Sequence, residues 1–192
     1  MEIYLLGLVS FFLFHSVRLY APHWRKSQRR KLGPWTWRGL YSLLSIATLA
    51  LLIVGYGRVR GEGPVFWTSP PWMHHVTALL VLVAFVFFAA AYIPRNRIKT
   101  ATGHPMTIGI KTWAFGHLLS NGSLADVLLF GSFLLWAVVL YSISRRRDRA
   151  AAVTYPKGNV AGDAITVVVG IVAWGVFAHF LHRPLTGVSP FP

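Results

Sequence analysis

Residues Leu124–Ser144 read LADVLLFGSFLLWAVVLYSIS, an apolar run in which Asp126 is the one charged side chain. At 1.5 Å of rise per residue, a helix of this length crosses the hydrocarbon core of a bilayer, which is about 30 Å thick. The basic run RRRDR follows directly at 145–149, as is typical of a chain that leaves the membrane on its cytoplasmic side. The stretch therefore predicts a transmembrane helix.

The composition of the whole chain agrees with this interpretation. The 192 residues are 55% hydrophobic and 12% charged, with a mean hydropathy of +0.53, whereas soluble domains are about 25% charged. We therefore expect an all-α, polytopic membrane protein of about six transmembrane helices in one bundle, forming a single domain over residues 1–192. The five further apolar segments are Ile3–Leu19, Trp35–Gly57, Pro71–Ile93, Pro105–Ser120 and Ala164–Leu181.

The segment at 105–120 differs from the others. It is shorter than the usual 17–25 residues of a transmembrane helix, and it carries Lys111 and His117. Both a full span and a re-entrant element fit this pattern.

The distribution of positive charge predicts the orientation. The loops after the first, third and fifth segments, with their flanks, carry seven, three and five Lys or Arg residues, and the basic loop at 21–33 is the richest of them. The opposite side carries Arg58, Arg60 and Arg183. Cytoplasmic loops hold the excess of Lys and Arg, so both termini are expected in the periplasm of a bacterial inner membrane. The net charge of +14 then faces anionic lipid rather than nucleic acid.

Side chains that could carry chemistry are few. The chain has no cysteine and five carboxylates, which excludes thiolate metal sites and leaves carboxylate-rich metal sites poorly supplied. Ionisable residues inside the hydrocarbon are costly and usually face the bundle interior. The histidines within or beside the apolar segments are therefore the candidate site residues, or else groups that form hydrogen bonds between helices. They are His15, His74, His75, His104, His117 and His179.

Imidazole-only ligation in an apolar bundle suits haem, which takes one or two axial histidines and apolar walls. On a helical wheel, Gly109, Trp113, Gly116 and His117 share a sector roughly 100° wide. Glycines beside a histidine leave room for a flat ligand or for a closely packed helix.

Three patches resemble a known family. His104-Pro105-Met106-x-x-Gly109 is followed by Trp113-Ala114-x-x-His117-x-x-x-Asn121-Gly122. Phe14-His15-Ser16 and Phe177-Ala178-His179 add to this pattern. Over essentially the whole chain, the sequence resembles the NnrU family of bacterial membrane proteins and the related 15-cis-zeta-carotene isomerase, a haem b enzyme.

The resemblance implies a function and a ligand pair. NnrU proteins are associated with nitrite and nitric-oxide reduction in denitrifying bacteria, and the isomerase binds haem through histidines that match His15 and His117. Ala114 stands where the isomerase has a cysteine, so a redox-linked change to thiolate ligation is impossible in this chain.

Depth in the membrane conflicts with that ligand pair. His15 lies about 5 Å from the cytoplasmic interface marked by Arg18, whereas a helix that starts at His104 places His117 about 20 Å from the same interface. Two axial ligands of one iron cannot differ in depth by ~15 Å, and ordinary helix tilt does not close the gap.

Two arrangements remove the conflict. Lys111 could mark the true interface, or His117 could pair in the outer half of the membrane with His74 or His179. We take His15 and His117 as the pair that the resemblance implies, with His74 as the first reserve.

The sequence thus predicts a membrane protein of the NnrU type that binds haem b and supports denitrification, as a redox-linked or assembly factor beside a membrane reductase or oxidase. Two alternatives stay open. One is a haem-dependent cis-trans isomerase acting on a polyene or lipid. The other is a cofactor-free membrane partner of a reductase or oxidase.

Overall fold

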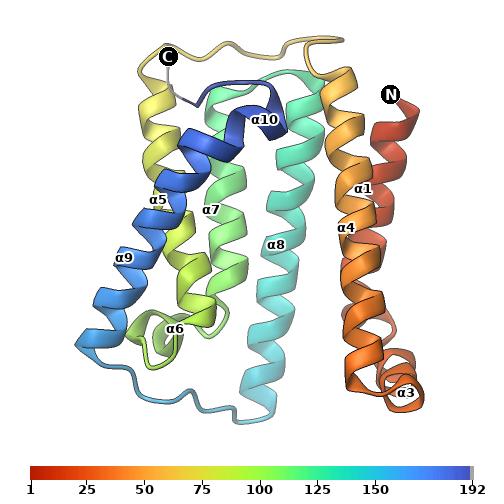
Figure 1. The fold of residues 1–192 in the computed structure, drawn as a ribbon, viewed down its shortest axis with the longest axis vertical. Helices are drawn as coiled ribbons and strands as arrows, with labels where there is room; N and C mark the ends of the chain where they lie inside the picture. The colour runs from red at the N-terminus through yellow and green to blue at the C-terminus, as the bar shows by residue number, and fades with distance from the viewer. Residues whose placement is uncertain (191–192) are drawn as a thin grey trace. The chain divides into compact units, whose positions relative to one another are not determined.

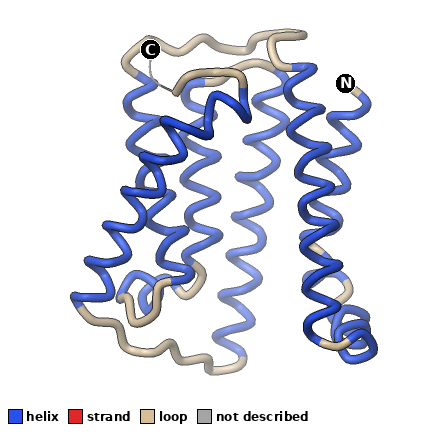
Figure 2. Tube along the Cα trace, viewed as in Figure 1, coloured by secondary structure: helices blue, strands red, loops and turns tan. Residues whose placement is uncertain are grey.

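The computed structural model describes residues 1–190, which are helical apart from loops and one isolated bridge between Val65 and Ser123 (Figures 1 and 2). In chain order the helices are α1 (Glu2–His15), α2 (Val17–Tyr20), α3 (Pro22–Leu32), α4 (Pro34–Val59), α5 (Met73–Tyr92), α6 (Arg97–Thr102), α7 (Pro105–Ser120), α8 (Leu124–Ala150), α9 (Val160–Val176), the π-helical turn η1 (Phe177–Leu181) and α10 (His182–Thr186).

Among the described residues, four helical runs are long and apolar enough to cross a membrane: α4, α5, α8 and the continuous run Val160–Thr186. α1 is a shorter apolar helix. The outward faces are apolar as well, since side chains such as Leu43, Ile46 and Leu135 are about two-thirds exposed. The prediction of an all-α membrane protein is therefore confirmed, with four candidate spans.

The predicted apolar segments all coincide with helices, but two stretches differ in detail. The first segment is interrupted at Ser16, where α1 gives way to the short α2. The basic stretch at 21–33, expected to be a loop, forms α3. Pro22 occupies the first turn of α3, where its missing N–H costs nothing, and the Lys and Arg residues that follow are good helix formers.

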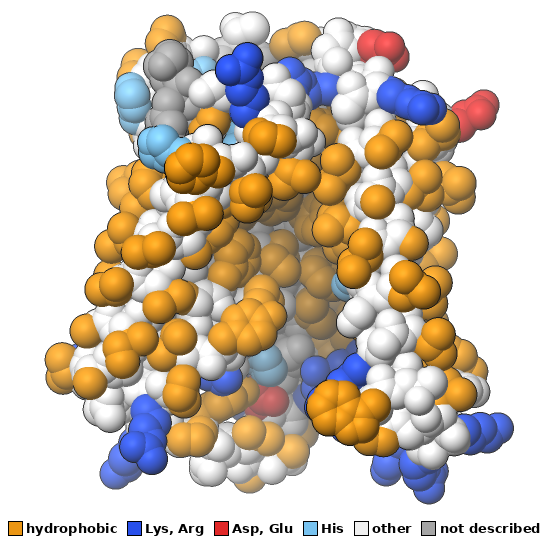
Figure 3. All heavy atoms as spheres, viewed as in Figure 1, with side chains coloured by type: hydrophobic (Ala, Val, Ile, Leu, Met, Phe, Trp, Pro, Cys, Tyr) orange, Lys and Arg blue, Asp and Glu red, His pale blue; other side chains and the backbone are white. Residues whose placement is uncertain are grey.

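The helices pack as two compact units, Met1–Glu62 and the residues from Gly63 onward. In each unit, hydrophobic side chains cover the middle of the helices on the face that Figure 3 shows, and Lys and Arg lie toward the helix ends. This is the pattern of helices surrounded by lipid.

In the first unit, α1 and α4 pack through small residues. A Cβ atom added to Gly55 would lie 2.6 Å from Tyr4 Cα, and one added to Gly7 would lie 2.8 Å from Leu52 Cα. Tyr4 is completely buried. Such close backbone approach is how membrane helices gain van der Waals contact without a hydrophobic driving force.

In the second unit, α5 packs against α7 and α9, and α7 packs against α8 (Figure 1). The glycines on α7 allow α5 to approach: Gly109 faces Phe88, and Gly116 faces Leu80. The sequence predicted that these glycines leave room either for a flat ligand or for a closely packed helix. The structure shows the closely packed helix, α5.

Polar contacts hold the two ends of the second unit. At one end, the Thr77 hydroxyl donates to Gly116 O at 2.8 Å, and Phe66 N donates to Gly122 O. At the other end, the buried Asn96 donates to the carbonyls that close α5, and the Arg97 side chain pairs with Asp163 at 2.5 Å.

Candidate functional site

Of the histidines in the second unit, His117 is the one whose surroundings best suit a ligand of a metal or cofactor. It lies near the C-terminal end of α7. Its Nδ1 lies 2.9 Å from Trp113 O, one helical turn earlier. Because a carbonyl oxygen can only accept, Nδ1 carries the proton and Nε2 carries the lone pair. Among the described residues, Nε2 has no hydrogen-bond partner. A backbone carbonyl that fixes the tautomer in this way is the usual support of a metal-binding imidazole.

Aromatic rings enclose this imidazole. The Phe130 ring, from α8, stacks on it with centroids 4.6 Å apart and an interplanar angle of 23°. Trp113 lies 5.2 Å from His117 and packs edge-on against Phe130 and Phe133. Rings held this way fix the orientation of the imidazole and keep its surroundings apolar.

His182 begins α10, at the end of the second unit where α7 ends (Figure 1). It was not among the predicted site residues. His182 follows the π-helical turn η1, and its Nδ1 donates to Val188 O at 2.8 Å. π-helical turns inside helices often mark functional positions, but the sequence pattern gave no sign of one here.

His15, in the first unit, repeats the arrangement of His117. Its Nδ1 donates to Phe11 O at 2.8 Å, and its ring stacks on Phe11 with centroids 4.0 Å apart. Tyr41, from α4, lies edge-on at 6.0 Å. Two histidines thus share one local design: a tautomer set by the carbonyl of the preceding turn, and a phenyl ring against one face.

His74 and His179 are more exposed than His117. His74 lies in the first turn of α5, one turn before Thr77, which bonds to the last turn of α7. It is therefore at the same end of the unit as His117. His179 lies within η1, where its Nδ1 donates to Gly175 O at 3.1 Å.

A family model described as NnrU protein matches residues 3–190. The chain belongs to the NnrU family. No curated protein and no solved structure matches it. The resemblance first seen in three short patches therefore holds over nearly the whole chain, and the matched region includes His15 and His117.

In this NnrU-family chain, His104 belongs to a different cluster. Its Nε2 donates to Asp148 Oδ2 at 2.7 Å, and the Tyr155 hydroxyl donates to the same oxygen at 2.5 Å. His104 precedes the first turn of α7 and His117 lies in its last, so about 20 Å of helix separates them. The structure does not bring these two histidines together.

Within the described residues of the NnrU-family chain, no group of three or more His, Cys, Asp or Glu side chains could hold a metal ion. A haem does not need such a group, because four of its iron ligands come from the macrocycle. Lys111, the charged residue in the middle of α7, reaches over the ring of Tyr141 at 4.2 Å. This cation–π contact partly replaces the hydration that the ammonium group loses.

Proposed function

We propose that this NnrU-family membrane protein binds haem b through His117 and one further histidine. In that form it would support nitrite and nitric-oxide reduction, as a redox-linked or assembly factor beside a membrane reductase or oxidase. The observation that carries the proposal is the state of His117: its Nδ1–H is committed to Trp113 O, and its Nε2 has no partner among the described residues. A neutral imidazole with a free Nε2 is the common axial ligand of haem iron.

The surroundings of His117 fit this role. Phe130 and Trp113 pack against the imidazole and keep its surroundings apolar, as in a haem site with apolar walls. Asn121 donates to His117 O at 2.8 Å and holds the end of the helix in place. A bound haem would supply one-electron redox chemistry, while the protein orients the ligand and excludes water.

The second ligand has several candidates. His15 has the same hydrogen-bonded tautomer and phenyl contact as His117, and the resemblance names it. His74 lies at the same end of the second unit as His117, and His182 begins α10 at that end as well. We rank His15 first and His74 as the first reserve.

The proposal includes six crossings, with α1–α2 and α7 added to the four candidate spans. α7 supports this count, because it runs from the basic end of the second unit at His104 to the opposite end at Asn121, alongside α5 and α8. Its 16 residues span about 24 Å, so a short local thinning of the bilayer is required. Both termini would be periplasmic. Reporter fusions at Asn121 should read periplasmic and those at Gln28 cytoplasmic, and the opposite result would overturn the orientation.

The decisive experiment is purification of the full chain in detergent, with visible spectra and a pyridine haemochrome assay. We expect a b-type spectrum in the wild type, its collapse in His117→Ala, and a normal spectrum in the control His75→Ala, which changes an exposed histidine of the same bundle. His15→Ala, His74→Ala and His182→Ala then identify the second ligand by loss of the six-coordinate spectrum. Wild-type protein without a Soret band, or His117→Ala with normal haem, would overturn the assignment.

The physiological role needs a test in cells. A denitrifying host that lacks this chain should consume nitrite and nitric oxide more slowly. The wild-type chain should restore the rate, and His117→Ala should not. If the wild-type chain and His117→Ala restored the rate equally, His117 would not be required for the function.

A further inference from the structure

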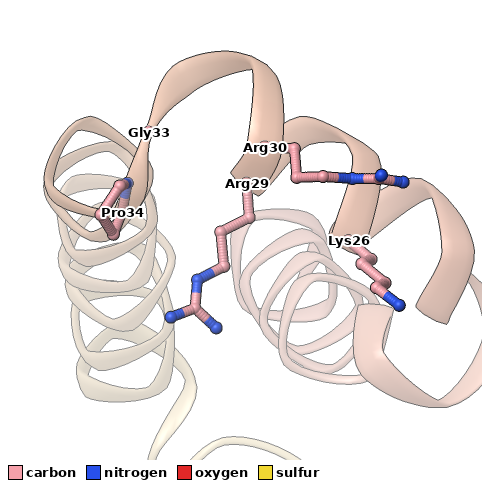
Figure 4. A pocket seen from close by; sticks show the side chains of 5 residues that line it. All are labelled: Lys26, Arg29, Arg30, Gly33 and Pro34. Carbon is pink, nitrogen blue, oxygen red and sulfur yellow. The ribbon is translucent and has the colours of Figure 1, made fainter.

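An open depression lies beside α3, in the first unit. It has a volume of about 420 Å³ and is lined by Lys26, Arg29 and Arg30 on α3 and by Gly33 and Pro34 at the start of α4. Figure 4 shows Arg29 extending toward the start of α4, while Lys26 and Arg30 extend on its other side. The size is within the ~300–1,000 Å³ range of small-ligand sites, and the polar lining consists of cations.

The charges around this depression are not neutralised within the unit. Six Lys or Arg residues lie between positions 22 and 38, with no carboxylate among them. The carboxylates of the first unit are Glu2, at the start of α1, and Glu62, after the end of α4. The ion pairs Arg97–Asp163 and His104–Asp148 lie in the second unit. Like charges held this close repel one another, so a bound anion would stabilise α3 where it lies.

The aromatic residues beside the depression place it at the level of lipid headgroups. Trp24 is 53% exposed and Trp35 is 78% exposed. Trp24 packs edge-on against Trp37 at 6.1 Å, and Arg38 lies over the Trp35 ring at 5.1 Å. Exposed tryptophans gather at the membrane–water interface. A short basic helix that carries a tryptophan, as α3 carries Trp24, is typical of a helix that lies in that interface.

We propose that this depression binds the phosphodiester headgroup of an anionic phospholipid. The cations fan out instead of converging on one point, which suits a phosphate carried on a larger headgroup better than a compact free anion. Lys and Arg between or beside transmembrane helices on the cytoplasmic side commonly bind such headgroups. The proposal uses none of the candidate haem ligands and does not depend on haem.

The test uses the full chain in detergent and native mass spectrometry, which counts bound lipids. Phosphatidylglycerol is titrated against phosphatidylcholine with the same acyl chains. Wild-type protein should bind its first phosphatidylglycerol more tightly than phosphatidylcholine. The variant Lys26→Gln/Arg29→Gln/Arg30→Gln should bind phosphatidylglycerol roughly 100-fold more weakly, since each cation at an anionic surface contributes about fivefold. Its affinity for phosphatidylcholine should not change.

The control variant Arg25→Gln/Lys31→Gln/Arg38→Gln removes the same charge from the same stretch but changes no residue that lines the depression. It should lose much less affinity, and circular dichroism should show native helix content in both variants. Equal losses in the two variants, or no loss in either, would overturn the proposal. Inorganic phosphate is added as a competitor. Full displacement of the lipid by phosphate at millimolar concentration would identify a free-anion site and would also overturn it.

Discussion

The imidazole of His104 and the carboxylate of Asp148 meet at 2.7 Å, although 44 residues separate them in the chain. Their contact joins the start of α7 to the last turn of α8. Tyr155, from the loop after α8, donates to the same carboxylate oxygen. One acidic side chain thus fastens three segments at the basic end of the second unit, which gives His104 a structural role.

We predict that Asp148→Asn loosens this end of the unit. The uncharged amide oxygen is a weaker acceptor than the carboxylate oxygen for both the His104 and the Tyr155 donors. Because the side chains are partly exposed, the apparent melting temperature should fall by only a few degrees. Thermal unfolding in detergent measures this. The effects of Asp148→Asn and Tyr155→Phe should overlap in the double variant, since both remove one contact, whereas Asp163→Asn should add its own effect. If the losses in Asp148→Asn and Tyr155→Phe added fully in the double variant, the shared contact would be contradicted.

The phenol of Tyr155 should ionise at a higher pH than an ordinary tyrosine. Burial raises the pKa of Tyr155 above its ordinary value of about 10, and the hydrogen bond to the Asp148 carboxylate raises it further. A pKa that is raised by folding stabilises the folded state below the unfolded pKa, and this contribution is lost as the pH rises through the folded value. In an alkaline titration followed at 295 nm, Tyr155→Phe should therefore lack one of the phenols that ionise at unusually high pH in the wild type. In Asp148→Asn that phenol should titrate at a lower pH than in the wild type, because the hydrogen bond and the negative charge that raise its pKa are both removed. Identical curves for wild type and Tyr155→Phe would contradict the prediction.

Much of the fold could be predicted because bilayer thickness sets the length of apolar runs. The segment at 105–120 has in the structure the bounds expected from its flanking proline and turn. α3 could not be predicted in this way, because its helix forms without an apolar face of transmembrane length. The break at Ser16 and the π-helical turn before His182 also have no signature in hydrophobicity.

The candidate site was predictable only in part. Histidines stand out in an apolar chain, so His15 and His117 could be selected from the sequence. The ring against His117 could not be identified, because nearly every residue of α8 near Phe130 is apolar and no periodic contrast marks the inward face. The pairing of His104 with Asp148 was missed for a different reason: it depends on how two helices align, which a single sequence does not specify.

Thr77 provides a hydrogen bond between α5 and α7, and its removal should weaken that contact. Its hydroxyl lies 2.8 Å from Gly116 O and 2.5 Å from the Ser120 hydroxyl, and the side chain is buried. Thr77→Val keeps the shape and removes the donor, so we expect a loss of about 0.6–2 kcal/mol in unfolding free energy. Thr77→Ser should be closer to wild type. The control is Thr112→Val, because the Thr112 hydroxyl bonds only within its own helix. Unfolding in mixed detergent–SDS micelles gives the comparison, and equal effects at both positions would contradict the interhelical role.

Two glycines on α4 offer a matched test of how the first unit packs. A Cβ atom at Gly55 would meet the backbone of Tyr4, which cannot move aside as a side-chain end could, whereas a Cβ atom at Gly57 would meet nothing within 4 Å. Gly55→Ala should therefore separate α1 from α4 and destabilise the unit by about 1–3 kcal/mol. Gly57→Ala should be neutral or stabilising by up to about 1 kcal/mol, because alanine restricts the unfolded backbone. The same unfolding assay in micelles measures both. If the two variants were equally stable, α1 and α4 could not be as close as Tyr4 and Gly55 require, and the packing of His15 against Tyr41 across these helices would have to be abandoned as well.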